Sequence, residues 1–448
     1  MGEGEGRGDV RATTADGDRG PHGGHGTYHG THPTDGGLRT IAQHRTEVLS
    51  LVDALAPVEI DVSRAAGHVL ADDVVAATDL PAWDNSAMDG WAVRRDDVVG
   101  ASPRAPVTLT VLADLPAGSD AEPEVTPGTA ARIMTGAPLP PGADAVVPVE
   151  HTDGFGDSGL RDTVRVDREP APAAHIRRAG EDVRRGDVVL RAGALLGPAR
   201  IAAAASAGAG TVRVHRRPRV VVVPTGSELV PPGEPLRRGQ VADSNSILLV
   251  AAAEAAGCEA VRVPAVPDDP ERLRGVLDEL EADADLVVTT GGVSVGAYDV
   301  VKAALTGWGD VRFVRVAMQP GKPQGLGRLP GGTPVLCLPG NPVSAHVSFE
   351  VFVRPALLRL RGVGRLDRPT MRAEVADGWR TAPGRAQYMP VALQRDDDGV
   401  LRARRSVAGG SGSHLVAGLA QSDGLAFVDV DVEEVRPGDV LPVFRTGG

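Results

Sequence analysis

Two residue types on which many protein sites depend are nearly absent from this chain. Its 448 residues include only two cysteines, Cys258 and Cys337, each in an apolar or helical stretch. Because two cysteines are too few for a disulfide framework, we expect a reducing, cytoplasmic location. Lysine is also scarce: Lys302 and Lys322 are the only two, and nearly every other positive charge is an arginine. Lysine is a compact point charge and arginine a planar fork, so the two are not interchangeable at a phosphate.

Long apolar runs and excess positive charge are also missing. No apolar run approaches the roughly 20 residues of a membrane-spanning helix, and the first residues lack the apolar core of a signal peptide. The formal net charge of −12 argues against a general nucleic-acid or anionic-membrane surface. We therefore expect neither as a partner, and a site for an anionic small ligand would have to be locally positive.

Several common catalytic and nucleotide-binding motifs do not occur. Gly208-Ala-Gly210 lacks the third glycine and the helix of a dinucleotide fingerprint, and no Gly-Lys-Ser/Thr phosphate loop is present. No Gly-x-Ser-x-Gly elbow follows a strand, and Ser411 lies in a glycine-rich turn, so a Ser-His-Asp hydrolase is poorly supported.

Changes in composition along the chain predict its division into domains. Residues 1–37 are rich in glycine, aspartate and histidine without apolar periodicity, which is typical of a disordered tail. Histidines 22, 25, 29 and 32 could bind a stray metal there, or be incidental. The remaining segments are a mixed linker domain (38–80 and 179–216), an inserted β-rich module (81–178), an α/β domain (217–363) and a small C-terminal β-barrel (364–448).

The segment from 217 to 363 alternates short β-branched runs with helical stretches, which favours a parallel sheet with right-handed crossovers. One run, Leu286-Val-Val-Thr, leads into the glycine-rich loop Thr289–Asp299. Ligands of such sheets bind beyond the carboxyl ends of the strands, where glycines let the backbone approach an anion. Alone, this loop is equally consistent with a tight turn that binds nothing.

Further polar turns follow the neighbouring strands, and we expect them to meet at one edge of the sheet. Carboxylates at that edge could bind a divalent cation, while backbone and cationic groups could bind a phosphate. The residues expected to contact the ligand are Thr225, Gly226, Gly291, Gly292, Ser294, Pro320, Gly321, Pro339, Gly340, Asn341 and Ser344.

Further motifs, most of them outside the α/β domain, together resemble those of a known protein family. The relevant stretches are Asp84-Asn-Ser-Ala-Met-Asp-Gly90, Arg132-Ile-Met-Thr-Gly-Ala-Pro138, Gly142-Ala-Asp-Ala-Val-Val147, Gly180-Glu-Asp182, Asp243-Ser-Asn245, Gly291-Gly-Val-Ser-Val-Gly296 and Leu338-Pro-Gly-Asn-Pro342. In this order, over about residues 38–446, the chain resembles the molybdopterin molybdenumtransferase family (MoeA), to which the C-terminal domain of gephyrin is related.

The resemblance implies an enzyme that inserts molybdate into adenylylated molybdopterin and releases AMP, in the last step of molybdenum cofactor synthesis. It also implies help from Mg²⁺ or another divalent cation, and a homodimer whose cleft is shared between subunits. In such a dimer, residues 38–80 and 179–216 would form an elongated linker or dimer domain. Molybdoenzyme apo-proteins or other cofactor-synthesis enzymes are the protein partners it suggests.

Site residues carried over by motif position come from both subunits. The resemblance places Asp89 and Thr135 on the partner side of the cleft and Ser413 on the C-terminal barrel. It gives Glu228, Asp268 and Asp299 as the acidic group, with Glu228 and Asp299 as metal ligands, and Arg315 and Lys322 as positive charges.

The chain departs from the family pattern at three positions. Ser227 replaces the aspartate of the usual Thr-Gly-Asp-Glu, Gln319 stands where a lysine is frequent before Pro-Gly, and Arg315 stands at another frequent lysine position. We expect Lys322 to replace part of the missing positive charge.

Two alternatives follow from these departures and from the α/β domain. The chain could be a molybdopterin-binding scaffold with weakened catalysis, which retention of all three carboxylates disfavours. It could also be a molybdopterin adenylyltransferase acting one step earlier, although that activity would need only the α/β domain.

Overall fold

The computed structural model describes residues 37–156, 160–293, 299–406 and 415–446. The histidine-bearing tail up to residue 36, Ser294 and Ser413 lie outside the described residues, so the expectations about them stay untested. Within the described ranges, no helix combines the length and apolarity that crossing a membrane would require.

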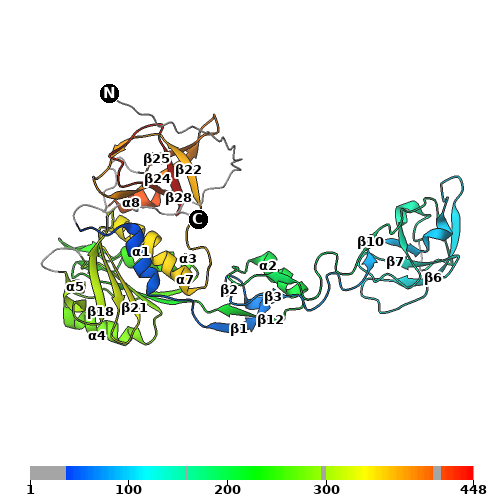
Figure 1. Cartoon of the computed structure of the whole chain (residues 1–448), viewed down its shortest axis with the longest axis horizontal. Coiled ribbons are helices and arrows are strands. Elements are labelled where there is room, and N and C mark those ends of the chain that lie inside the picture. Colours follow the sequence, from blue (N-terminus) through cyan, green and yellow to red (C-terminus); the bar gives the residue numbers. More distant parts are fainter. Residues whose placement is uncertain (1–36, 157–159, 294–298, 407–414, 447–448) are drawn as a thin grey trace, which may run out of the picture.

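The chain is strongly elongated (Figure 1). The α/β unit and the C-terminal barrel lie at one end, a narrow linker occupies the middle, and the β-rich module lies at the other end. Chain order is different from this spatial order, because the path runs out through the linker to the module and then returns.

A six-stranded mixed sheet forms the centre of the α/β unit, in the order β16-β13-β17-β21-β20-β18. Its strands are β13 (Arg219–Pro224), β16 (Glu259–Arg262), β17 (Leu286–Thr290), β18 (Asp310–Arg315), β20 (Pro323–Arg328) and β21 (Pro334–Leu338). The first four in spatial order are parallel, as expected, whereas β20 is antiparallel to both β21 and β18. Residues 316–322 are too few for a crossover, which needs about a dozen residues, so β18 and β20 can only be antiparallel.

Alternation of side chains along β13 contributes to two cores, one on each face of the sheet. Val220 and Val222 of β13 face one group of helices, while Val221 and Val223 face the other, because successive strand side chains point to opposite faces. The helices are α1 (Ile41–Ser50), α3 (Asn245–Ala255), α4 (Pro270–Glu281), α5 (Val300–Leu305), α6 (Pro342–Ser348) and α7 (Arg354–Leu360), with a π-helical segment at Phe349–Val353. Helices α4 and α5 cover one face and the others cover the opposite face. Helix α1, which the sequence division assigned to the linker, therefore packs in the α/β core.

The linker consists of short strands and one helix. Its elements are β1 (Pro57–Asp61), β2 (Val69–Leu70), β3 (Val74–Val75), β11 (Val188–Leu190), β12 (Thr211–His215) and α2 (Pro198–Ser206). The outgoing strand β1 and the returning strand β12 are antiparallel partners, so both passages of the chain leave the α/β unit together.

The β-rich module is built on a five-stranded sheet, in the order β8-β5-β7-β6-β9. Its strands are β5 (Gly90–Val93), β6 (Val107–Leu115), β7 (Thr129–Ile133), β8 (Ala145–Pro148) and β9 (Thr163–Val166), beside the short pair β4 (Asn85–Ser86) and β10 (Ile176–Arg177). A core lies on each face of the sheet, one of them centred on the fully buried Trp91.

The C-terminal region is a closed barrel, because β24 pairs with both β25 and β26. Its strands are β22 (Thr370–Val375), β24 (Ala386–Arg395), β25 (Leu401–Arg405), β26 (Gly424–Val428) and β28 (Val440–Arg445). Short elements around it are β19 (Met318–Gln319), β23 (Trp379–Arg380), β27 (Glu434–Val435) and α8 (Val416–Ala420).

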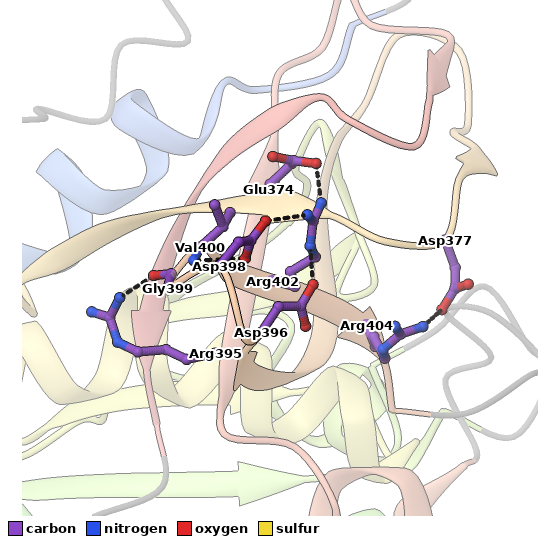
Figure 2. A network of polar contacts seen from close by, with 9 residues as sticks. All are labelled: Glu374, Asp377, Arg395, Asp396, Asp398, Gly399, Val400, Arg402 and Arg404. Carbon is purple, nitrogen blue, oxygen red and sulfur yellow. Dashed lines mark hydrogen bonds and ion pairs between the residues drawn. The ribbon is translucent and has the colours of Figure 1, made fainter.

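An arginine-centred network supports one side of the barrel (Figure 2). The guanidinium of Arg402 pairs with Glu374 on β22, with Asp396 in the β24–β25 turn and with Asp398 at 3.4 Å. It thereby joins β22 to the β24–β25 hairpin, where only two residue pairs of the parallel β22–β25 ladder are in register.

A buried arginine joins the α/β unit to the linker. Arg361, only 7% exposed, donates from Nη1 to the carbonyl oxygen of Ala256 at 2.7 Å and from Nη2 to that of Gly67. Ala256 ends helix α3, whereas Gly67 belongs to the linker. Burial lowers the pKa of this guanidinium, and the two carbonyl oxygens compensate for the water it has lost.

We expect Arg361→Met to lower the melting temperature by about 5 °C, because one buried and one part-buried carbonyl group lose charge-assisted hydrogen bonds. Scanning calorimetry measures this. Arg359→Met is the matched control: its guanidinium is more exposed and lies 3.2 Å from exposed Asp53, so its loss should change stability little. Equal shifts for both variants would contradict a role for Arg361 in the joint.

Candidate active site

The strand ends of the α/β unit surround an open cleft of about 930 Å³. The reversal at β20 keeps the end of β18 on this edge, since Arg315 is paired with Pro323, which itself lines the cleft. The predicted residues in its wall are Thr225, Gly226, Glu228, Asp268, Gly291, Gly292, Asp299, Pro339, Gly340, Asn341 and Ser344.

Glycines make this convergence possible. Gly291 has a φ of +101°, and a Cβ there would lie 2.5 Å from the carbonyl oxygen of Thr225. Gly226 has a φ of +141°, and a Cβ there would lie 2.4 Å from a carboxylate oxygen of Glu228. Larger residues would therefore push the β13 and β17 turns apart or displace the Glu228 carboxylate.

The wall of the cleft is acidic. Its four carboxylate side chains are Glu228, Asp243, Asp268 and Asp299, and no lysine or arginine is among the described residues that line it. The expectation of a locally positive site is therefore wrong for these side chains. An anionic ligand here would depend on a bound cation or on charge brought from elsewhere.

Ser227, the departure from the family pattern, has a clear structural role. Its backbone N–H donates to the Asp268 carboxylate at 3.1 Å, and its hydroxyl accepts from the backbone N–H of Asp268 at 3.0 Å. The reciprocal pair holds the turn after β13 against the residues before α4. Compared with the family pattern, the chain lacks a carboxylate at position 227, but Ser227 orients the carboxylate of Asp268.

Asp299 directly precedes α5. Its Oδ2 is buried and has no hydrogen-bond partner in the described part of the chain. Such an oxygen suits a cation, because an unpaired buried carboxylate oxygen is otherwise costly. Within those same ranges, no three or more His, Cys, Asp or Glu side chains form a ready-made metal site.

The predicted positive turn lies beside the cleft and is not in its described wall. Arg315 is exposed at the end of β18, and Lys322 is half-buried just before β20. Pro320 and Gly321 are buried between them, and the Gly321 carbonyl accepts from Gln324 Nε2 at 2.7 Å. Ser294 and Ser413, at the remaining predicted positions, lie outside the described residues.

Asp89 and Thr135 form a pair in the β-rich module. Oδ1 of Asp89 accepts from the backbone N–H of Thr135 at 2.7 Å and from its hydroxyl at 2.8 Å. These bonds hold the pKa of the Asp89 carboxyl below its usual range. The two motifs thus meet within the module, which lies at the other end of the chain from the cleft (Figure 1).

Several wall residues were missing from the predicted site, among them Asp243 and Asn245. Asn245 donates from Nδ2 to the carbonyl oxygen of Gly340 at 2.6 Å and to Thr290 Oγ1 at 3.1 Å. Asp243 is buried and accepts from the backbone N–H of Ser246 at 3.1 Å. The signal was the Asp243-Ser-Asn245 motif itself, which lies at the start of α3.

Family models match most of the chain. Residues 39–208 match the MoeA N-terminal region (domain I and II), residues 221–359 a probable molybdopterin binding domain, and residues 372–445 the MoeA C-terminal region (domain IV). A relative from Mycobacterium tuberculosis, molybdopterin molybdenumtransferase 2, is 44% identical over 413 residues, which are 91% of this chain and 99% of that protein. The chain belongs to the MoeA family.

Other MoeA proteins are also similar to this chain in sequence and in structure. Molybdopterin molybdenumtransferase 1 of the same organism is 36% identical over 91% of this chain and 98% of its own length. The crystal structure of a molybdopterin biosynthesis MoeA protein from Pyrococcus horikoshii is 29% identical, with a TM-score of 0.78 over 92% of this chain and all of that one. The multi-domain fold predicted from the sequence is thus confirmed.

We expect Thr135→Val to raise the pKa of Asp89 toward that of an ordinary aspartate, because one of its two hydrogen bonds is lost. The backbone bond remains, so the shift should be partial. The stability contributed by the pair is present above the ordinary aspartate pKa and is lost as pH falls through the lower, folded-state value. NMR titration of the carboxyl carbon measures the shift. Thr108→Val is the control: Thr108 is an exposed residue of β6, so its substitution should leave the pKa of Asp89 unchanged.

Proposed function

We propose that this MoeA protein inserts molybdenum from molybdate into adenylylated molybdopterin and releases AMP, in the cytoplasm. The observation that carries the proposal is the glycine-lined acidic cleft at the carboxyl ends of β13, β17 and β21. Such a cleft suits a phosphoanhydride that binds together with a cation, because carboxylates supply the hard oxygen ligands that Mg²⁺ prefers.

Glu228 and Asp299 are the residues we assign to Mg²⁺ or another divalent cation. The buried, unpartnered Oδ2 of Asp299 supports this assignment, and so does the excess of carboxylates in the wall. Since the described residues form no complete metal site, oxygens of the substrate would provide the other ligands. The cation supplies positive charge that stabilises the anionic leaving group.

The chain's own cysteines are unsuited to hold molybdenum. Both are buried, and burial raises the pKa of each thiol to about 12. A thiolate is the form that binds a metal, so burial in these apolar surroundings disfavours both cysteines as ligands. As the family resemblance implies, the thiolates that hold molybdenum would belong to the pterin substrate.

Other residues would orient the substrate. Asp268, oriented by Ser227, can accept a hydrogen bond from it, and Ser344 lies in the first turn of α6, where backbone N–H groups favour an anion. Arg315 and Lys322, beside the cleft, would bind the terminal phosphate or molybdate.

A homodimer would complete the site. Asp89 and Thr135 lie too far along the elongated chain to serve the cleft of their own subunit (Figure 1). We infer that they reach the cleft of a second copy. Molybdoenzyme apo-proteins or other cofactor-synthesis enzymes would receive the product.

Purified protein given adenylylated molybdopterin, molybdate and Mg²⁺ should release AMP and activate an apo-molybdoenzyme. We expect Glu228→Gln to slow AMP release about 100-fold and to require more Mg²⁺, because a charged cation ligand becomes neutral. Glu234→Gln, an exposed glutamate outside the cleft wall, is the control. Tight binding without AMP would indicate a scaffold, and ATP consumption would indicate an adenylyltransferase.

Mixing two inactive variants tests the shared cleft. Asp89→Asn and Glu228→Gln damage different walls, so a mixed dimer should keep one intact cleft. After denaturation and joint refolding in equal amounts, we expect roughly a quarter of wild-type AMP release, since half the dimers are mixed and each has one active cleft of two. The shared cleft would be contradicted if AMP release did not recover although mass spectrometry verified the mixed dimers. Asp89 and Glu228 would then belong to the cleft of the same subunit, or Asp89 would lie outside the cleft.

A further inference from the structure

Asn245 links three walls of the cleft. It opens α3, and its Nδ2 donates to the carbonyl oxygen of Gly340, in the turn after β21, at 2.6 Å. The same nitrogen donates to the hydroxyl of Thr290, the last residue of β17, at 3.1 Å. Thr290 in turn donates to the carbonyl oxygen of Pro339 at 3.4 Å.

This arrangement requires a side chain that donates hydrogen bonds, which the asparagine amide does and a carboxylate does not. The Thr290 hydroxyl uses its one proton on Pro339, so it must accept from Asn245, while the Gly340 carbonyl can only accept. The network therefore assigns the –NH₂ group to this side of the amide. An aspartate has the same shape but no donor, and would place a carboxylate oxygen against a carbonyl oxygen.

The amide acts where the sheet itself stops. The last register pair between β17 and β21 is Thr290 with Leu338. Beyond it the two glycine turns touch, since a Cβ on Gly340 would lie 3.3 Å from the Cα of Gly291. No side chain separates these turns, and Asn245 holds both: one through the Gly340 carbonyl, the other through Thr290.

The other amide atom also points to a role beyond folding. Oδ1 of Asn245 is buried and has no hydrogen-bond partner among the described residues. Buried acceptors are nearly always paired, so an unpaired one in the wall of a ligand cleft calls for a functional explanation.

We propose that Asn245 is a positioning residue for the AMP-releasing step. It sets the spacing between the Gly291 turn, which leads to Asp299, and the Gly340 turn, which leads to Ser344. The cation side and the anion side of the cleft are then held at a fixed separation. This inference rests on the proposed function.

The test compares Asn245→Asp and Asn245→Ala with wild type in AMP release, with Glu254→Ala, exposed on the same helix, as the control. We expect kcat to fall about 10- to 100-fold in both variants, because small misplacements of reacting groups have effects of this size. KM for adenylylated molybdopterin should change far less. The aspartate should be worse than the alanine, since it repels the Gly340 carbonyl, and Glu254→Ala should match wild type.

Thr290 supplies an independent check if either Asn245 variant folds poorly. Thr290→Ser retains the hydroxyl and Thr290→Val retains the shape, so AMP release should fall much further in the valine variant. Wild-type kcat in Asn245→Asp and Asn245→Ala, or equal rates for serine and valine at Thr290, would overturn the inference. Those results would leave the proposed function intact, which fails only if the wild-type protein itself releases no AMP.

Discussion

The site depends on one steric constraint: three strand ends approach so closely that backbone meets backbone. A Cβ on Gly291 would lie 2.5 Å from the carbonyl oxygen of Thr225, and a Cβ on Gly340 would lie 3.3 Å from the Cα of Gly291. Each turn is thereby forced to present its polar residues outward into the cleft, which is why carboxylates from separate segments share one wall. The long linker and the barrel add groups to this arrangement but do not create it.

Local patterns explain how much of the fold could be predicted. The Val220–Val223 run and the Leu286-Val-Val-Thr run are β-branched, buried strands, and glycines at their ends mark the turns of the cleft. The antiparallel β20 could not be recognised in the same way. Its sequence, Pro-Gln-Gly-Leu-Gly-Arg, has little β propensity, and its pairing with β21 determines its conformation.

The candidate site was predictable to a similar extent. Turn residues after strands lie where the sequence pattern places them, because parallel strands end at one edge. Asn245 was not assigned, since its partners are a hydroxyl 45 residues away and a carbonyl 95 residues away. The acidity of the wall also escaped prediction, because it depends on which charged side chains turn inward, and Arg315 does not line the wall.

The short strand β19 has a consequence for mechanics. It pairs with β24 of the barrel, and the neighbouring Ala317 accepts from the backbone N–H of Ala386 at 3.0 Å. On its other side, Ala317 donates to the carbonyl oxygen of Arg39, just before α1. The segment that joins Arg315 to Lys322 is therefore held between the barrel and the residues that precede α1. The positions of these two positive charges at the rim of the cleft are therefore coupled to the position of the barrel through backbone hydrogen bonds.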